Sequence, residues 1–204
     1  MTLSITFLRH ANARPATDAL ETSDQARPLS PKGIDQAATR REALGNRNYS
    51  LVLCSPTIRT IHTSEIVSGN PRQRTFVSEL LPYQGEKMDA LFAKLAYAPL
   101  STYRKEDGGL VDEVAQQAHV AIVRCIKSRT KIESVPDYKD YRVLVVGHAV
   151  VLNALGCAFL HKEGRQGAGS LQLQGELAEL ALGEACGFTL VFDGDNIQAR
   201  EIHQ

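Results

Sequence analysis

The chain has 204 residues, 43% of them hydrophobic, and its 23 lysines and arginines are balanced by 23 aspartates and glutamates. A net charge of zero gives no broad basic field, so we expect no nucleic acid and no acidic membrane surface as a partner. The apolar runs are also far shorter than the roughly 18 residues of a membrane-spanning helix, and the charged residues near the start do not fit a signal peptide. We therefore expect a cytoplasmic protein in which residues 1–204 form a single domain.

The cysteines Cys54, Cys125, Cys157 and Cys186 lie far apart in apolar stretches and form no CxxC pair. This pattern indicates buried, reduced thiols rather than a zinc site or a disulfide framework. We therefore expect no metal bound through cysteine.

The first predicted element is a strand over about 3–8, which runs directly into Arg9 and His10. A polar loop over 12–28 follows, and loops of this kind often rim a site. Residues 30–44 predict a helix, because a serine followed by a proline is typical of an N-cap and a first helical residue.

The second predicted strand ends at Cys54 and runs into Ser55 and Pro56, which repeat the pattern of a capping serine and a proline. We therefore expect a helix that starts there and holds Arg59 in its first turn. After that helix, residues 74–81 are typical of a short extended segment.

Helical spacing and extended runs alternate through the rest of the chain, interrupted by a polar stretch over 99–109 that we expect to be a loop. This alternation indicates an α/β fold, a three-layer α/β/α sandwich with a mainly parallel central sheet. The further predicted helices cover 88–95, 110–132 and 150–160, and the further predicted strands cover 142–146, 177–182, 188–192 and 197–202.

Three of the predicted strands end in residues suited to binding phosphate. The first is followed by Arg9 and His10, the second by the helix with Arg59, and the strand over 142–146 by His148. If these strands are parallel neighbours, their carboxyl ends meet at one edge of the sheet. Two arginines and two histidines would then converge on one crevice, which is a site for an anion.

Short motifs surround these residues: LRHA at 8–11, LSPKGIDQA at 29–37, SPTIRT at 55–60 with Thr63, and VGH at 146–148. In this order they resemble the signatures of the histidine phosphatase superfamily, also called phosphoglycerate mutase-like. An arginine–histidine pair alone is common, but the whole set over roughly residues 3–160 is specific. The resemblance implies a phosphoglycerate mutase-like fold.

The resemblance also implies that His10 is the nucleophile and becomes phosphorylated. It gives Arg9, Arg59 and His148 the role of holding the transferred phosphoryl oxygens, and water then cleaves the phosphohistidine without a metal or another cofactor. Guanidinium groups suit the charge that spreads over a phosphoryl group in transfer. Two arginines nearby would also lower the pKa of His10 and leave a ring nitrogen free to attack.

Two further roles in binding follow from position and chemistry. His148 would donate a hydrogen bond to the phosphoryl oxygens, either as an imidazolium or from the appropriate tautomer. Asn12 lies two residues past His10 and is a candidate to bind substrate.

The sequence departs from the superfamily pattern at the residue that protonates the leaving oxygen. Many members have leucine, any residue, glutamate, two residues and glycine there, whereas this chain has Pro82 within 80–85. Glu79 is the candidate substitute, with Glu86 and Asp89 also close, although each is equally well explained as a solvated charge. A similar pattern with proline occurs in short bacterial phosphohistidine phosphatases, whose leaving nitrogen needs no strongly placed acid.

These observations favour a metal-independent phosphatase that hydrolyses a phosphomonoester or phosphohistidine through a phosphorylated His10. Its partner would be a phosphorylated small molecule or a phosphohistidine protein. The alternative is a catalytically weak member of the fold that binds phosphate or regulates. Basic residues in the segment 86–109 either line a substrate mouth or form a solvated helix face.

Overall fold

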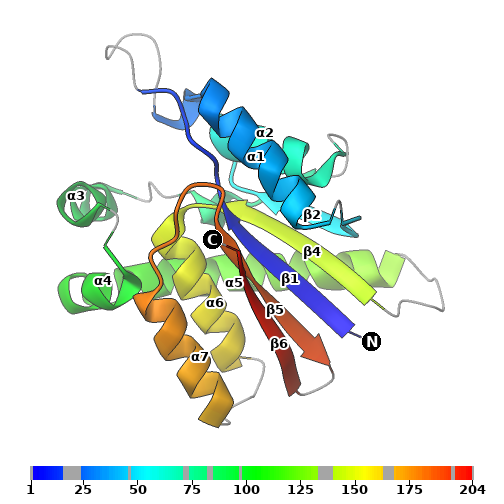
Figure 1. Cartoon of the computed structure of the whole chain (residues 1–204). Helices are drawn as coiled ribbons and strands as arrows, with labels where there is room; N and C mark the ends of the chain where they lie inside the picture. Colours follow the sequence, from blue (N-terminus) through cyan, green and yellow to red (C-terminus); the bar gives the residue numbers. More distant parts are fainter. Residues whose placement is uncertain are drawn as a thin grey trace.

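Within the described residues, six strands form a single sheet in the computed structural model of the chain, in the order β3-β2-β4-β1-β5-β6 (Figure 1). Strands β1 to β4 run parallel, while β5 pairs antiparallel with β1 and β6 antiparallel with β5. The strands are Thr2–Arg9 (β1), Leu51–Cys54 (β2), Arg74–Phe76 (β3), Asp140–Gly147 (β4), Gly187–Asp193 (β5) and Asn196–His203 (β6). The structure describes residues 2–15, 24–45, 47–70, 74–81, 85–96, 98–132, 140–162, 168–193 and 196–203.

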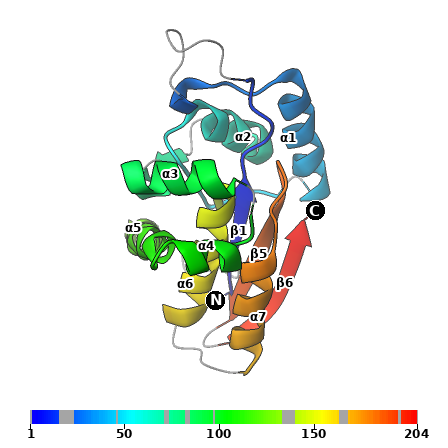
Figure 2. The ribbon, with the colours of Figure 1, turned by 90° about the vertical axis from the view of Figure 1, so that its left-hand side faces the viewer.

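Helices cover both faces of this sheet, with α1 and α2 on one face and α3 to α7 on the other (Figures 1 and 2). This is the predicted three-layer α/β/α sandwich with a mainly parallel sheet. In the described part of the chain, no helix is both long and apolar enough to cross a membrane. The helices are Pro31–Ala43 (α1), Ile58–Ser68 (α2), Glu86–Leu95 (α3), Leu100–Glu106 (α4), Leu110–Ile132 (α5), Ala149–Lys162 (α6) and Ala168–Glu179 (α7), with 3-10 helices Asp24–Ala26 (η1) and Ser78–Leu80 (η2).

Side chains of the central strands alternate between two hydrophobic cores, one on each face of the sheet. In β1, Ile5 and Phe7 belong to the larger core, which also holds residues of α5 and α6. Leu8 belongs to the smaller core beside α1 and α2. A sheet buried on both faces explains why these strands read as continuous apolar runs in the sequence.

The parallel register brings the ends of the central strands to one edge of the sheet. Arg9, the last residue of β1, pairs with Gly147, the last residue of β4. Just beyond the strands, the backbone N–H of His10 donates to the carbonyl of Gly147 (3.1 Å), and that of Ser55 donates to the carbonyl of Val146 (3.0 Å). The residues that follow β1, β2 and β4 are therefore neighbours, as the sequence predicts.

The prediction of a loop over 99–109 is wrong, because residues Leu100–Glu106 form α4. Leu100 and Tyr103 lie one turn apart and are both fully buried in the larger core. The polar residues between and after them hide this short apolar face, and a single pair of core contacts is too little periodicity to recognise in a sequence.

Two predicted extended runs are also corrected. In the run over 177–182, the first residues end α7, and Leu177 is buried against the larger core. Apolar residues at this spacing fit a strand and a helix equally well, so the tertiary packing decides. In the run over 74–81, only the three residues of β3 are extended, and η2 follows. The other predicted helices and strands lie close to their expected bounds.

Candidate active site

A cavity of about 470 Å³ lies beyond the carboxyl ends of β1 and β4. Its lining includes the predicted residues Arg9, His10, Asn12, Arg59 and His148. These side chains come from three separate stretches of the chain, and the parallel register of the strands brings them together. A volume of this size is typical of a small-molecule site.

The ring of His10 is fixed by its own backbone neighbour. Its Nδ1 atom lies 2.8 Å from the carbonyl oxygen of Ala11. A carbonyl oxygen can only accept a hydrogen bond, so Nδ1 carries the proton and the lone pair lies on Nε2. The backbone N–H of Ala11 in turn donates to Oγ1 of Thr63 on α2 (3.1 Å), which fixes this loop. Nε2 is therefore the atom of His10 available as a nucleophile.

Burial lowers the pKa of His10 from 6.5 to about 3, and it is the largest cause of the shift. The hydrogen bond to Ala11 opposes this shift, while the charges of Arg59, Arg9 and Arg27 lower the pKa further. The sequence correctly predicts that the pKa of His10 is lowered, but it attributes the shift to the arginines, whereas desolvation by burial contributes more. His10 is thus neutral across the physiological range.

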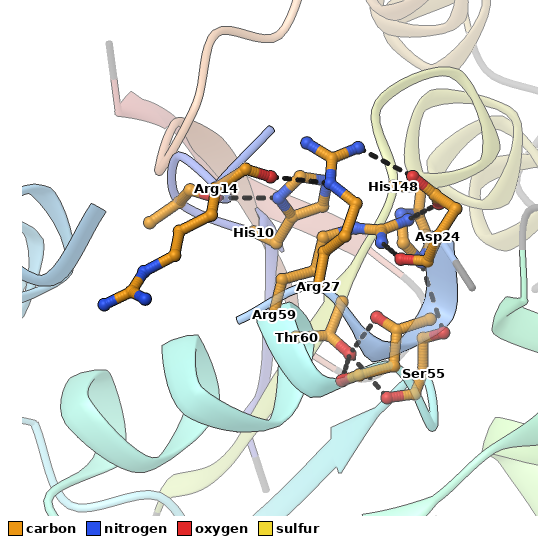
Figure 3. A network of polar contacts seen from close by, with 10 residues as sticks. His10, Arg14, Asp24, Arg27, Ser55, Arg59, Thr60 and His148 are labelled. Carbon is orange, nitrogen blue, oxygen red and sulfur yellow. Dashed lines mark hydrogen bonds and ion pairs between the residues drawn. The ribbon is translucent and has the colours of Figure 1, made fainter. Parts of the chain in front are cut away.

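His148 lies beside His10, with the two rings at 65° and their centroids 5.2 Å apart. Its Nε2 atom is 3.2 Å from Oγ of Ser55, a hydroxyl that orients the ring in either tautomer (Figure 3). Burial, followed by the nearby His10, Arg59 and Arg9, holds the pKa of His148 well below its usual value. Of the two forms that the sequence leaves open, the structure favours a neutral His148 that donates from one ring nitrogen.

Arg59 lies in the first turn of α2, but the predicted cap of that helix is wrong. The N-cap is Thr57, and Ser55 and Pro56 precede the helix. Ser55 is instead directed to His148, because its backbone is held at the end of β4. Arg59 is only 4% exposed, and it is aimed into the cavity.

Arg27 and Asp24 line the cavity, and the sequence analysis does not predict them. Arg59 donates to the backbone carbonyl of Asp24 and, at 2.8 Å, to its Oδ2 atom, while Arg27 donates to Oδ1 at 2.6 Å (Figure 3). Nε of Arg27 also donates to the carbonyl of Arg14 (2.7 Å). The available signal was the polar loop over 12–28, which was expected to rim a site. A carboxylate between two guanidinium groups shows that the charge of this corner of the cavity is complementary to an anion.

Arg9 is 7% exposed and lines the same cavity. Its Nη1 atom donates to the carbonyl oxygen of Leu182 (2.6 Å), which ties the end of β1 to the loop after α7. This contact holds the planar side chain in one direction at the wall of the cavity.

The side chain of Asn12 is held by two protein partners. Its Oδ1 accepts from Oγ of Ser30 (2.5 Å), and its Nδ2 donates to Oε1 of Glu184 (2.7 Å). Gln36 accepts from the backbone N–H of Asn12 (2.9 Å). Asn12 therefore lines the cavity, but much of its hydrogen-bonding capacity is used to fix the loop after His10.

Glu184 is the second missed residue with a carboxylate in the lining. It reaches the cavity from the irregular segment after α7, where the backbone of its neighbour Ala185 is held at two points. The N–H of Ala185 donates to the carbonyl of His10 (3.3 Å), and Nε of Arg40 donates to the carbonyl of Ala185 (2.6 Å). No local sequence pattern indicates such a contact.

The structure does not bring Glu79 to the cavity. Glu79 lies on η2, accepts a hydrogen bond from Oγ of Ser78 (3.0 Å) and is outside the lining. Glu86 and Asp89 are exposed on α3 and also lie outside the lining. Among the described residues, the carboxylates that line the cavity are those of Asp24 and Glu184.

A family model described as the histidine phosphatase superfamily (branch 1) matches residues 5–182. A search of curated proteins found no match. Among solved structures, the chain is similar to a mycobacterial glucosyl-3-phosphoglycerate phosphatase, with 20% identity, a TM-score of 0.64 and coverage of 99% of this chain and 97% of that chain. It is also similar to phosphoserine phosphatase from Entamoeba histolytica (14% identity, TM-score 0.60, 99% and 97% covered) and to YhfR from Bacillus stearothermophilus (20%, 0.59, 96% and 94%).

The family match spans most of the chain, and the solved structures share its fold at low identity. The chain therefore belongs to branch 1 of the histidine phosphatase superfamily. It is an enzyme of the phosphatase type, a hydrolase. The match of the family model confirms the resemblance to the histidine phosphatase superfamily that the sequence motifs indicated.

Proposed function

We propose that the enzyme hydrolyses its substrate without a metal ion, through a covalent phosphohistidine on His10. The observation that supports this most is a neutral His10 whose Nε2 lone pair is set by the hydrogen bond from Nδ1 to Ala11. Arg9, Arg59 and His148 line the same cavity. One nucleophile and several fixed positive or N–H groups are the parts that phosphoryl transfer requires.

The proposed reaction consists of two displacements at phosphorus. In the first, Nε2 of His10 forms a bond to phosphorus while the bond to the leaving atom breaks, and the leaving atom takes a proton from solvent. In the second, water attacks the phosphohistidine, the phosphorus–nitrogen bond breaks, and its electron pair returns to Nε2. Inorganic phosphate leaves, and His10 is ready for another cycle.

Charge complementarity at the phosphoryl oxygens is the main contribution of the protein. Arg59 and Arg27 already hold the carboxylate of Asp24, so their N–H groups are placed to grip an anion. Fixed cationic donors in a partly dehydrated cavity stabilise the charge of the transition state without reorganising during the reaction. A phosphoryl group would take the place of the Asp24 carboxylate.

The two carboxylates in the described lining are engaged as hydrogen-bond acceptors. Asp24 accepts from two guanidinium groups, and Glu184 accepts from Asn12 and Gln36. We therefore propose a leaving group that departs with little acid assistance, either in a phosphomonoester or in a phosphohistidine. The substrate would be a phosphorylated small molecule or a phosphohistidine protein.

Turnover of para-nitrophenyl phosphate and of a phosphohistidine peptide in the presence of a chelator tests this function. The unmodified enzyme should hydrolyse at least one of them, and His10→Ala should abolish turnover, because it removes the atom that attacks phosphorus. His161→Ala is the matched control, since His161 is exposed on α6 and outside the lining. Activity that the chelator removes, or that survives in His10→Ala, would contradict the mechanism.

A second candidate function is phosphate binding with little turnover. The observation that favours it is that Glu79, the candidate proton donor, lies outside the described lining. Binding of inorganic phosphate without turnover of either substrate would support this alternative.

A further inference from the structure

One wall of the cavity has no role in the proposed phosphoryl chemistry. Phe92 on α3, Ala96 and Ala98 after that helix, and Val150 on α6 all line the cavity, and we call these residues the apolar wall. They face the same space as the arginines and histidines at the ends of β1, β2 and β4. The cavity thus combines a cationic part for a phosphoryl group with an apolar part for whatever is attached to it.

The apolar wall is held in place by Tyr103 of α4. The hydroxyl of this fully buried residue donates to the carbonyl of Ala96 (2.7 Å), and its ring lies 5.7 Å from that of Phe92. Ala96 has a φ of 46°, a conformation that residues other than glycine rarely adopt. A strained backbone that persists must be held by its surroundings, and such positions concentrate at functional sites. Tyr103 therefore fixes the wall before any ligand binds.

The basic residues of this segment do not reach the cavity. Lys94 pairs with Glu106 (2.7 Å) and Arg104 with Asp112 (2.8 Å), and the first pair is more exposed than the second, whose side chains are 35% and 38% exposed. These contacts support the solvated-face interpretation of this segment rather than a basic substrate mouth.

The charges around the cavity disfavour a second anionic group on the substrate. Among the described residues, the lysines and arginines in the lining are limited to Arg9, Arg27 and Arg59, which serve the phosphoryl group. The carboxylates of Asp24 and Glu184 lie in the same lining. A carboxylate or second phosphate on the leaving group would therefore meet repulsion and no further described cation.

We infer that the enzyme acts on compounds with a single phosphoryl group whose leaving group is apolar. This inference rests on the proposed phosphatase function and specifies the substrate class of that site. The apolar wall removes the leaving group from water, and the arginines hold the phosphoryl group. Phe92 and Ala98 determine this specificity by contact with the leaving group.

Matched aryl phosphates test the inference. Phenyl phosphates with a butyl, a 3-hydroxypropyl or a 2-carboxyethyl group at position 4 share a phenolate leaving group of similar basicity, so their rates differ mainly through the tail. We expect kcat/KM for the butyl compound to exceed that for the hydroxypropyl compound about fivefold, because the tail leaves water. It should exceed that for the carboxyethyl compound about thirtyfold, because charge repulsion is added.

Variants of the apolar wall locate the effect. Phe92→Ala should lower kcat/KM for the butyl compound about fivefold and change the hydroxypropyl compound less than twofold. Phe76→Ala is the matched control, since Phe76 is 54% exposed on β3 and outside the lining. Ala98→Lys should raise kcat/KM for the carboxyethyl compound about tenfold by adding a cation to the wall.

The outcomes separate the inference from the proposed function. Equal or reversed rates for the butyl and carboxyethyl compounds would overturn the inference while leaving the phosphatase function intact. If no compound is hydrolysed, the phosphatase function fails, and binding of butylphosphonate against 2-carboxyethylphosphonate, measured by calorimetry, decides the inference. Tighter binding of butylphosphonate supports the apolar wall, and equal binding refutes it.

Discussion

The carboxylate of Asp24 lies where the proposed mechanism would place a phosphoryl group. The carboxylate accepts from both Arg59 and Arg27, and the arginine N–H groups used for it are the ones that a phosphoryl oxygen would need. Carboxylates and phosphates bind guanidinium forks in the same geometry. Under the proposed mechanism, substrate would have to displace Asp24, and the strength of that contact would subtract from the affinity for phosphate.

Asp24→Asn should tighten the binding of inorganic phosphate about three- to tenfold, because the neutral amide keeps the shape but loses the charge that competes for the arginines. Isothermal titration calorimetry measures the change directly. Asp89→Asn removes one exposed carboxylate from α3 outside the lining and should leave phosphate affinity unchanged. Weaker binding in Asp24→Asn would mean that Asp24 orients the arginines instead of competing with the ligand.

The sequence predicts the residues of the site that directly follow strands, and it misses those that arrive through loops. Arg9, His10 and His148 are predictable because the ends of parallel strands must meet at one edge. Glu184 is not, because its position depends on backbone contacts with His10 and Arg40, which are distant in the sequence. The same limit applies to loop residues that are ordered only by long-range contacts.

Helix α1 positions the loop after His10 through close contact rather than through charge. A Cβ atom on Gly33 would lie 2.0 Å from the carbonyl oxygen of Asn12, so the helix reaches this distance only with glycine. Ser30 caps the helix, with its Oγ accepting from the backbone N–H of Gly33 (3.1 Å) as predicted. The start of α1 thus both carries a helix signal and forms a contact surface for the loop after His10.

Gly33→Ala should lower the free energy of unfolding by about 1–3 kcal/mol, because the added methyl group must push the Asn12 backbone away. The intrinsic helix preference for alanine acts in the opposite direction by about 1 kcal/mol, so the sign of the result is informative. Gly175→Ala on α7 is the control, because nothing lies within 4 Å of its Cβ position and the change should stabilise the fold. Urea unfolding of both variants measures the difference. Equal stabilisation in the two variants would show that the loop after His10 shifts at little energetic cost to accommodate the methyl group.

Elements with a long or unbroken apolar pattern are found where the sequence predicts them, and α4, which has neither, is not. Helix α5 and strand β2 have their predicted bounds, because each carries a long or unbroken apolar pattern. Helix α4 has seven residues, and its core contribution is Leu100 and Tyr103. Its formation depends on the space beside α5 and α7, which only the folded chain defines.

At the scale of the whole molecule, the fold buries ionisable side chains at the site, where burial disfavours their charged forms. Arg9, Arg59 and His148 are each less than a tenth exposed at the edge of the sheet. Burial lowers the pKa of both His10 and His148, so folding holds both rings neutral while the unfolded chain can protonate them. The same burial that keeps His10 neutral therefore lowers the stability of the fold in acid.

The pH dependence of unfolding tests this link between site and fold. Stability rises with pH wherever the unfolded chain binds more protons than the folded chain. For His10, with a pKa of about 3 when folded and 6.5 as the reference value, that window lies between those values, so stability falls as pH drops below 6.5. Each of the two histidines should add up to about 1.4 kcal/mol per pH unit to the slope. Between pH 5.5 and 4.5, urea unfolding should therefore show a shallower slope for His10→Asn/His148→Asn than for the unmodified protein. Carboxylates titrate in both proteins and cancel in the comparison, so parallel slopes would mean that these rings take up protons in the folded state.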